Sequence, residues 1–276
     1  MNRRRDGRQR PSTARFALES RRVWALAAVL GLAIAGIVAA VGILASSSGS
    51  EPGPPRAAIV DQLALTDPNP EFVTAATREL QAAGYTVEYY RSELVTVDFY
   101  RNLPKRNYRF ILLRSHSSES VGKLDPATGK FTGEFTESSG LFTSEKYRND
   151  RYVDDQRANR LMVDSYIDRP IKDSFFGVMP AFISSSMKGN LHGATIMLMG
   201  CSGLKTDDLA KAFVARGAKD FVSWDGSVTA EHTDAAAEAL LKNLFSAQLD
   251  MREAVAQTMR QTGADPAFGS HLAVYP

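Results

Sequence analysis

The sequence predicts an α/β protein in three layers, with helices on both sides of a mostly parallel sheet, preceded by one N-terminal transmembrane helix. Two observations favour this fold class. Short apolar runs alternate with segments of helical periodicity through most of the chain, which is the pattern of strands joined by crossover helices. In addition, residues 23–45 contain no charged side chain. About 20 apolar residues are enough for a helix to cross a bilayer.

The N-terminal segments predict a membrane anchor. Residues 1–22 carry eight arginines and two acidic residues, and Trp24 lies at the arginine end of the apolar run. Basic residues on one flank predict that 1–22 stay in the cytoplasm and that the C-terminal domain is extracytoplasmic. The alternative is a secreted protein with a cleaved signal peptide, because Ser20-Arg21-Arg22 resembles a twin-arginine signal and Ala45 suits a cleavage site. The apolar region of a signal is usually about 7–15 residues, which favours the retained anchor.

A linker and one large domain follow the apolar run. Residues 46–56 are rich in Ser, Gly and Pro, a composition typical of a tether, so the folded domain is expected at 57–276. The net charge of +2 conceals an uneven distribution, because residues 46–276 hold 25 basic and 29 acidic groups. We expect no cluster of basic residues on this folded domain, and therefore no nucleic-acid partner.

The first half of the domain predicts three strands and two helices. Residues 57–65 form an apolar run that ends at a proline-rich turn, as expected for a buried strand. Apolar residues at helical spacing follow up to Gly84, where the helix is expected to stop. The remaining elements expected here are a strand at 86–90, a short helix at 95–103 and a strand at 110–113.

The second half predicts an insertion and then a return to the α/β pattern. Residues 117–172 are polar, with a hairpin expected at 125–129, and an insertion of this length often shapes a site. The elements expected after it are strands at 194–199 and 221–224 and helices at 204–216, 230–246 and 251–261.

Two reactive side chains follow predicted strands. His116 comes after the strand at 110–113, and Cys201 comes after the strand at 194–199. Ligands of parallel sheets gather at the carboxyl ends of the strands, so a Cys/His dyad is one interpretation. In that dyad the Cys201 thiolate would be the nucleophile and the His116 imidazole would activate it. The other interpretation is that Cys201, the only cysteine, packs as a small apolar residue and His116 ends a strand.

A wider pattern resembles a known family. Leu-Ala-Lys-Ala-Phe-Val-Ala-Arg-Gly-Ala at 209–218 leads into Phe-Val-Ser-Trp-Asp-Gly-Ser-Val at 221–228, and Asp234 comes next, with a long helix rich in Ala and Leu. With His116 and Cys201 placed after strands in this order, residues 57–262 resemble the caspase-like cysteine peptidases. That superfamily includes caspases, gingipains, clostripain, separase and CHAT-domain proteins, and the pattern is most similar to CHAT-type and gingipain-like microbial proteins.

The resemblance implies roles for further residues. Cys201 would supply one N–H of the oxyanion hole, as a Gly-Cys-Ser-Gly turn also allows. The family usually has glycine directly after the histidine; here Ser117 stands there and keeps the second N–H. Asp225 lies where several relatives select a basic side chain before the cleaved bond, although Asp-Gly is also a common turn pair. Trp224 is expected either in the core or as a wall of the substrate cleft.

Other chemistries lack a matching pattern. The chain has no zinc motif and no Gly-rich nucleotide loop, so no metal and no cofactor is predicted. The acidic residues Asp150, Asp154 and Asp155 leave calcium open, although their spacing matches no known loop. His232 is interpreted as a helix-face residue that could line the cleft. His192 and His271 are interpreted as surface residues.

Two functions remain open on the sequence. The first is a membrane-anchored, extracytoplasmic cysteine peptidase that uses His116 and Cys201 on a protein or peptide substrate. The second is a catalytically silent binding module of the same fold that holds a partner at the membrane surface. The two hypotheses differ in whether the thiol of Cys201 is accessible and faces His116.

Overall fold

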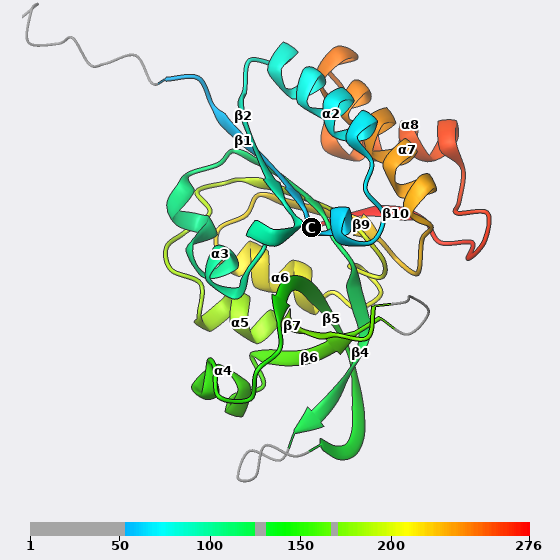
Figure 1. Ribbon diagram of the computed structural model, residues 1–276. Coiled ribbons are helices and arrows are strands. Elements are labelled where there is room, and N and C mark those ends of the chain that lie inside the picture. Colours follow the sequence, from blue (N-terminus) through cyan, green and yellow to red (C-terminus); the bar gives the residue numbers. More distant parts are fainter. Residues whose placement is uncertain (1–52, 125–130, 167–170) are drawn as a thin grey trace, which may run out of the picture. The chain divides into compact units, whose positions relative to one another are not determined.

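The structure is a computed structural model that describes residues 53–124, 131–166 and 171–276 (Figure 1). It confirms an α/β fold with a mostly parallel sheet, and residues 54–276 form one compact unit. The main sheet has six strands in the order β10-β9-β8-β3-β1-β2. These strands are β1 (Arg56–Asp61), β2 (Thr86–Arg91), β3 (Phe110–Arg114), β8 (Thr195–Met199), β9 (Asp220–Trp224) and β10 (Leu272–Tyr275).

Five of these strands were predicted, and all five run parallel to one another. The first is shorter than expected, because it ends at Asp61. The carboxylate of Asp61 accepts the N–H of Ala64 at 3.0 Å and so caps the short 3₁₀ helix η1 (Gln62–Leu65). β10 was not predicted; it pairs antiparallel with β9 at the edge of the sheet.

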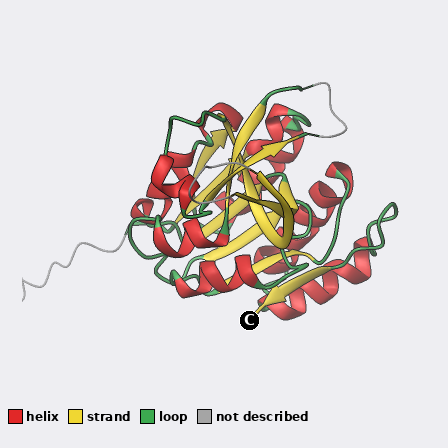
Figure 2. Cartoon of the chain, turned by 90° about the horizontal axis from the view of Figure 1, so that it is seen from below, coloured by secondary structure: helices red, strands yellow, loops and turns green. Residues whose placement is uncertain are grey.

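Helices cover both faces of the main sheet (Figure 2). On one face lie α2 (Pro70–Ala82), α7 (Ala230–Leu241) and α8 (Met251–Thr262). On the other face lie α3 (Val97–Asn102), α5 (Pro180–Ser185) and α6 (Asp208–Ala215). The short helices η2 (Ser92–Leu94) and η3 (Leu103–Arg106) flank α3, and the π-helix η4 (Lys242–Ser246) extends α7, so the helix expected at 230–246 changes type near its end.

The insertion forms a second sheet. Its four strands are antiparallel in the order β4-β5-β7-β6, with α4 (Val153–Arg157) between β5 and β6. The strands are β4 (Ser117–Leu124), β5 (Phe131–Lys146), β6 (Leu161–Ser165) and β7 (Ser174–Val178). Leu141, Leu161 and Val178 from this sheet join the core beneath α3 and α5, so the insertion is part of the domain. The hairpin predicted at 125–129 lies outside the described residues.

The predicted membrane helix at 23–45 also lies outside the described residues. Among the helices of the described part, none combines the length and the apolar character needed to cross a bilayer.

Candidate active site

The pairing of β3 with β8 brings His116 and Cys201 to matching positions. The two strands are parallel neighbours, with Arg114 opposite Met199. His116 and Cys201 are each the second residue after that pair. Neighbouring strands lie about 4.8 Å apart, so the backbones of the two residues leave the sheet side by side. The Oγ–H of Ser117 donates to the carbonyl oxygen of Cys201 and ties the two segments together.

Gly200 is required for this close approach. A Cβ atom on Gly200 would lie 1.8 Å from the carbonyl oxygen of Ser115, which belongs to the backbone of the neighbouring segment. Real Cβ atoms do not come so close to another heavy atom, and backbone cannot move aside as the end of a side chain can. The glycine before the cysteine therefore has a packing reason in this chain.

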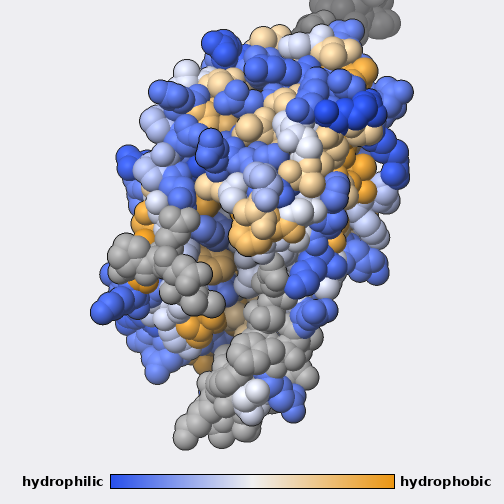
Figure 3. Space-filling view, turned by 90° about the vertical axis from the view of Figure 1, so that its right-hand side faces the viewer, coloured by the Kyte–Doolittle hydropathy of each residue, from blue (hydrophilic) through white to orange (hydrophobic). Residues whose placement is uncertain are grey.

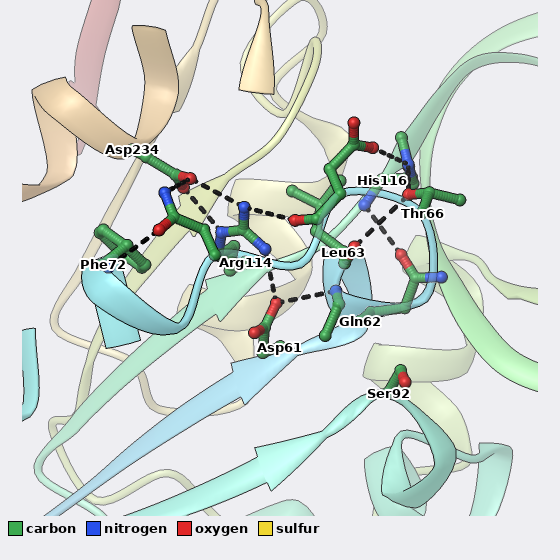
Figure 4. A network of polar contacts seen from close by, with 12 residues as sticks. Asp61, Gln62, Leu63, Thr66, Phe72, Ser92, Arg114, His116 and Asp234 are labelled. Carbon is green, nitrogen blue, oxygen red and sulfur yellow. Dashed lines mark hydrogen bonds and ion pairs between the residues drawn. The ribbon is translucent and has the colours of Figure 1, made fainter. Parts of the chain in front are cut away.

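The loop after β1 holds the imidazole of His116 (Figure 4). Its Nε2 atom lies 2.8 Å from Oγ1 of Thr66 and 3.8 Å from Oδ2 of Asp67. The backbone N–H of His116 donates to Oε1 of Gln62 at 3.1 Å. A hydroxyl and a carboxylate on one ring nitrogen fix the orientation of a histidine.

Aromatic side chains from the second sheet and its connection form the other wall around His116. The ring centroid of His116 lies 5.0 Å from that of Tyr166 and 5.8 Å from that of Phe142. The hydroxyl of Tyr166 accepts from Nε2 of Gln62 at 2.7 Å. Gln62 therefore holds both the backbone of His116 and the ring packed against it. With 21% of its side chain exposed, His116 still meets solvent.

A buried arginine fixes the loop that carries Thr66 and Asp67. Arg114 is 1% exposed and binds Asp234 through two nitrogens, both at 2.7 Å, and Asp61 at 2.8 Å. Its Nη2 atom also donates to the backbone carbonyl of Asp67 at 2.9 Å. Burial opposes the charge of Arg114, but its bonds to Asp234 and Asp61 raise the pKa of the guanidinium. Arg114 thereby links β1, α7 and the loop beside His116 (Figure 4).

Cys201 is partly buried at the end of β8. Its Sγ atom lies 3.5 Å from the carbonyl oxygen of Val228, to which the thiol proton donates. The following residue, Ser202, has φ of +55° and donates its N–H to the carbonyl oxygen of Gly226 at 2.8 Å. A thiolate has no proton to donate, so ionisation of Cys201 removes the contact with Val228. The hydrogen bond from Ser202 to Gly226 holds the backbone in a left-handed conformation directly after Cys201.

The predicted substrate-binding residues have different surroundings. Asp225 is exposed, its Oδ1 atom accepts the N–H of His271 at 2.7 Å, and its own N–H donates to the carbonyl of His271 at 3.0 Å. The expectation that Trp224 lines a cleft needs correction. Its side chain is fully buried and donates Nε1–H to Thr233 at 2.9 Å, so no ligand can touch it directly.

A hollow of about 470 Å³ lies next to His116. It is open to solvent between the loop before α2 and the first turns of α7. The polar residues that line it are Asp67, Asn69, Arg114, Glu231, Asp234 and Glu238. Because Asp61 and Asp234 already balance the charge of Arg114, the hollow is acidic. Asp67 belongs both to this hollow and to the surroundings of His116.

Asp164 is a buried carboxylate near the aromatic wall. It lies on β6 opposite Phe175, whose ring is 5.6 Å from Tyr166, and its Oδ2 atom lies directly over Gly177. Within the described part of the chain, Oδ2 of Asp164 has no hydrogen-bond partner. Burial raises the pKa of Asp164 to about 7, so the carboxyl group holds its proton in weakly acidic solution.

Asp155 and Asp150, two of the acidic residues of the insertion, are bonded to basic side chains. Asp155 binds Arg101 at 2.8 Å and Arg160 at 3.3 Å, and Asp150 binds Arg148 at 2.8 Å. Although burial acts in the opposite direction, hydrogen bonds from Ser186 and Arg101 hold the pKa of Asp155 below its ordinary value. No group of His, Cys, Asp and Glu with the geometry of a metal site occurs among the described residues.

The other histidines lie apart from the pairing of β3 with β8. His232 is on α7, with Nε2 3.2 Å from the carbonyl oxygen of Gly263 and its ring 5.3 Å from Trp224. His192 and His271 are exposed. These positions agree with the interpretation of His192 and His271 as surface residues.

No family model matches the chain, and no curated protein matches it.

Several residues around His116 were not found from the sequence. Gln62, Thr66 and Asp67 are close to His116 only because β1 neighbours β3, and Tyr166 directly follows β6 of the second sheet. A usable signal existed for Arg114, because a charged residue that ends an apolar strand is expected to be paired.

Proposed function

We propose that the chain is a membrane-anchored, extracytoplasmic cysteine peptidase of the caspase-like superfamily that acts on a protein or peptide substrate. One observation carries this proposal. His116 and Cys201 lie at matching positions beyond the carboxyl ends of two neighbouring parallel strands, with Nε2 of His116 held by Thr66. This placement supports the proposal, because catalytic residues of α/β folds gather beyond the carboxyl ends of the strands.

The proposed reaction is acyl transfer followed by hydrolysis. His116 takes the thiol proton, and Sγ of Cys201 attacks the substrate carbonyl carbon. The tetrahedral oxyanion is stabilised by backbone N–H groups, those of Cys201 and Ser117 being the predicted donors. The C–N bond then breaks and His116 gives its proton to the leaving amine. Water, deprotonated by His116, hydrolyses the thioester and releases the acid and the thiol.

The surroundings of His116 support its role as a base. An imidazole that loses and regains a proton needs a fixed orientation and a counter-charge for its cationic form. The hydroxyl of Thr66, 2.8 Å from Nε2, fixes the orientation of the ring, and the carboxylate of Asp67, at 3.8 Å, supplies the counter-charge. Both contacts are made at Nε2.

The charge at this edge favours a basic side chain in the substrate. Asp225 is the residue predicted from the sequence, and Glu231 is a second carboxylate, in the acidic hollow beside His116. A charge-assisted bond contributes roughly 1.5–3 kcal/mol, so loss of the relevant carboxylate is expected to slow cleavage of basic substrates about ten- to a hundredfold. A fluorogenic panel that differs only before the cleaved bond, run on Asp225→Asn and Glu231→Gln, identifies which carboxylate acts. Equal losses on uncharged substrates would refute the preference.

The experiment that tests the peptidase proposal is alkylation of Cys201 with an iodoacetamide probe across pH. We expect an apparent thiol pKa below the free value of about 8.5 and an upward shift in His116→Ala. The control is His192→Ala, which changes an exposed histidine at the opposite ends of the strands. A thiol that reacts identically in the wild type and His116→Ala would refute the dyad.

The second candidate is a catalytically silent binding module that holds a partner at the membrane surface. The observation in its favour is the contact of Sγ with the carbonyl oxygen of Val228, which retains the thiol proton. In that case Cys201 alkylates slowly at every pH, and Cys201→Ala leaves partner binding unchanged.

The proposed location has its own test. If residues 23–45 are retained as an anchor, the full chain resists extraction by alkaline carbonate, and added protease digests the domain from the exported side. Recovery of a soluble chain shortened near residue 45 would favour the secreted form.

A further inference from the structure

The amino ends of the parallel strands gather positive charge. Three loops run into β3, β8 and β9 there, at residues 103–109, 186–194 and 216–219. They contain six Lys or Arg side chains and no Asp or Glu: Lys105, Arg106, Arg109, Lys188, Arg216 and Lys219. These residues are scattered over more than a hundred positions of the sequence. The prediction that the domain has no basic cluster is therefore wrong, because β3, β8 and β9 are neighbours and bring these loops to one end of the sheet.

Hydrogen bonds join the three loops into one surface. Arg109 donates through Nη1 to the carbonyl oxygen of His192 at 2.7 Å. The N–H of Leu191 donates to the carbonyl of Arg216 at 2.9 Å. The loops before β3 and β8 also enclose a hollow of about 640 Å³, which Lys105 and His192 help to line. We call the surface formed by these three loops the basic face.

Most of the charge on the basic face is available to a partner. Lys105, Arg109 and Lys188 are exposed, and the side chain of Lys219 is 73% exposed. Two carboxylates border the face. Glu88 is bound to Arg56, and hydrogen bonds from Arg56, Tyr108 and Tyr90 lower its pKa to about 2. Asp220 is 17% exposed and lies 3.6 Å from Lys219.

The chain joins the domain at the basic face. β1 begins at Arg56, whose carbonyl oxygen accepts the N–H of Arg109 at 2.8 Å. The linker at 46–55 separates this point from the predicted membrane helix by ten residues. Ten residues span at most about 35 Å when fully extended, and a flexible chain of that length averages about 18 Å. If residues 23–45 anchor the chain, a tether of this length keeps the attachment point within about 35 Å of the bilayer.

We propose that the basic face docks the domain on anionic phospholipid headgroups. The inference rests on the membrane anchor in the proposed function and is independent of the peptidase activity. A basic surface is attracted to an anionic bilayer over about a Debye length, and each Lys or Arg near the surface adds to that attraction. The neighbouring anchor favours a bilayer over a nucleic acid, because it raises the local concentration of lipid around this face.

The test uses the full chain in phosphatidylcholine vesicles with or without phosphatidylglycerol. A fluorophore is placed by Ala215→Cys beside the basic face, or by Asp207→Cys at the carboxyl ends of the strands, each in a Cys201→Ser background. Nitroxide-labelled headgroups are expected to quench the probe at 215 only in the anionic vesicles, and high salt is expected to reverse the effect. The probe at 207 is expected to remain bright in both. Equal quenching at the two positions, or quenching at 215 that ignores the lipid charge, would overturn the proposal.

Matched charge variants separate docking from general electrostatics. Lys105→Gln, Lys188→Gln and Lys219→Gln combined are expected to lower the docking equilibrium constant on the order of a hundredfold. The control combines Lys146→Gln, Lys172→Gln and Lys205→Gln, which remove the same charge from exposed positions outside the basic face, and is expected to dock nearly as the wild type does. Equal effects of the two sets refute the basic face.

Two further readouts distinguish the remaining outcomes. Carbonate extraction reports whether the chain is anchored at all, so loss of the anchor cannot be mistaken for loss of docking. Binding of single-stranded DNA that depends on the same three lysines, without quenching by lipid, would make the partner a nucleic acid and overturn the proposal.

Discussion

The loops at the carboxyl ends and at the amino ends of the parallel strands differ in the sign of their charge. They also differ in whether the charged side chains are buried in ion pairs or exposed. The loops that leave the parallel strands carry Asp67, Glu93, Asp207 and Asp225 against Lys205, whereas the basic face carries six basic residues and no acidic one. At the carboxyl edge the strongest ion pairs are buried around Arg114; on the basic face the side chains are mostly exposed. Buried charges fix geometry, whereas exposed charges act at a distance through their sum.

Exposed apolar side chains also lie at the carboxyl ends of the strands. On the side where β4 lies in Figure 1, apolar surface is exposed in the middle and bounded by hydrophilic residues (Figure 3). Exposed Leu65 and Leu94 follow β1 and β2 at the carboxyl edge. A peptide that reaches this edge therefore meets apolar surface and negative charge together.

The largest expected effect comes from breaking the ion pairs at the carboxyl edge. Asp234→Ala leaves the guanidinium of Arg114 buried with only Asp61 to balance it. We expect the free energy of unfolding to fall by about 3–5 kcal/mol, as measured by urea denaturation. The control is Glu238→Ala, one turn along α7 on the rim of the same hollow, with an expected loss below about 1 kcal/mol. Equal losses would show that Arg114 is not held as described.

The next effect concerns Asp164. Its folded pKa of about 7 lies above the ordinary aspartate value of 3.8, so the folded state binds more protons than the unfolded state between these values. The free energy of unfolding is therefore expected to decrease as pH rises from about 4 to 7, by about 2–4 kcal/mol. In Asp164→Asn this decrease is expected to vanish, with the variant more stable than the wild type at pH 8. Asp173→Asn, which changes an exposed carboxylate nearby, is expected to retain it.

A smaller effect is expected at Thr66. Thr66→Val removes the hydroxyl that meets Nε2 of His116 and keeps the shape of the side chain. Loss of one such hydrogen bond corresponds to about 1.4 kcal/mol, so the rate of alkylation of Cys201 at pH 7 is expected to fall about tenfold. Thr66→Ser is expected to restore most of the rate. If the serine variant is as slow as the valine variant, the hydroxyl does not orient His116.

The smallest effects are expected on the basic face. Lys105→Ala and Lys188→Ala change exposed side chains, so the free energy of unfolding is expected to change by less than about 0.5 kcal/mol in urea denaturation. If the free energy of unfolding falls by more than about 2 kcal/mol in either variant, these lysines form stabilising ion pairs as Arg114 does, and the contrast between the two ends of the strands is wrong.

Local pattern was enough to predict the parallel core. The strands at 86–90, 110–113 and 221–224 and the helix at 251–261 each have a composition or periodicity that tertiary packing did not override. The strand expected at 57–65 was too long, because apolar content continues through Leu65 while the cap at Asp61 turns the backbone.

The second sheet and the surroundings of His116 could not be derived in the same way. β5 and β7 pair across a gap in sequence, and the Ser, Thr and Gly residues of β5 give only a weak signal of alternation. The contacts of His116 with Thr66, Asp67 and Tyr166 depend on which strands become neighbours, which composition does not specify. His116 and Cys201 themselves could be proposed because each directly follows an apolar strand.

The length of β1 has a consequence for the reach of the molecule. Its six residues run from Arg56, at the basic face, to Asp61, one residue before the side chain that holds His116. At about 3.3 Å per residue, the strand separates the two edges by roughly 20 Å. A domain docked through its basic face would hold Cys201 about that far above the lipid. Target segments anchored in the same bilayer would need at least six or so extended residues to reach the thiol, so those emerging closer to the membrane would be spared.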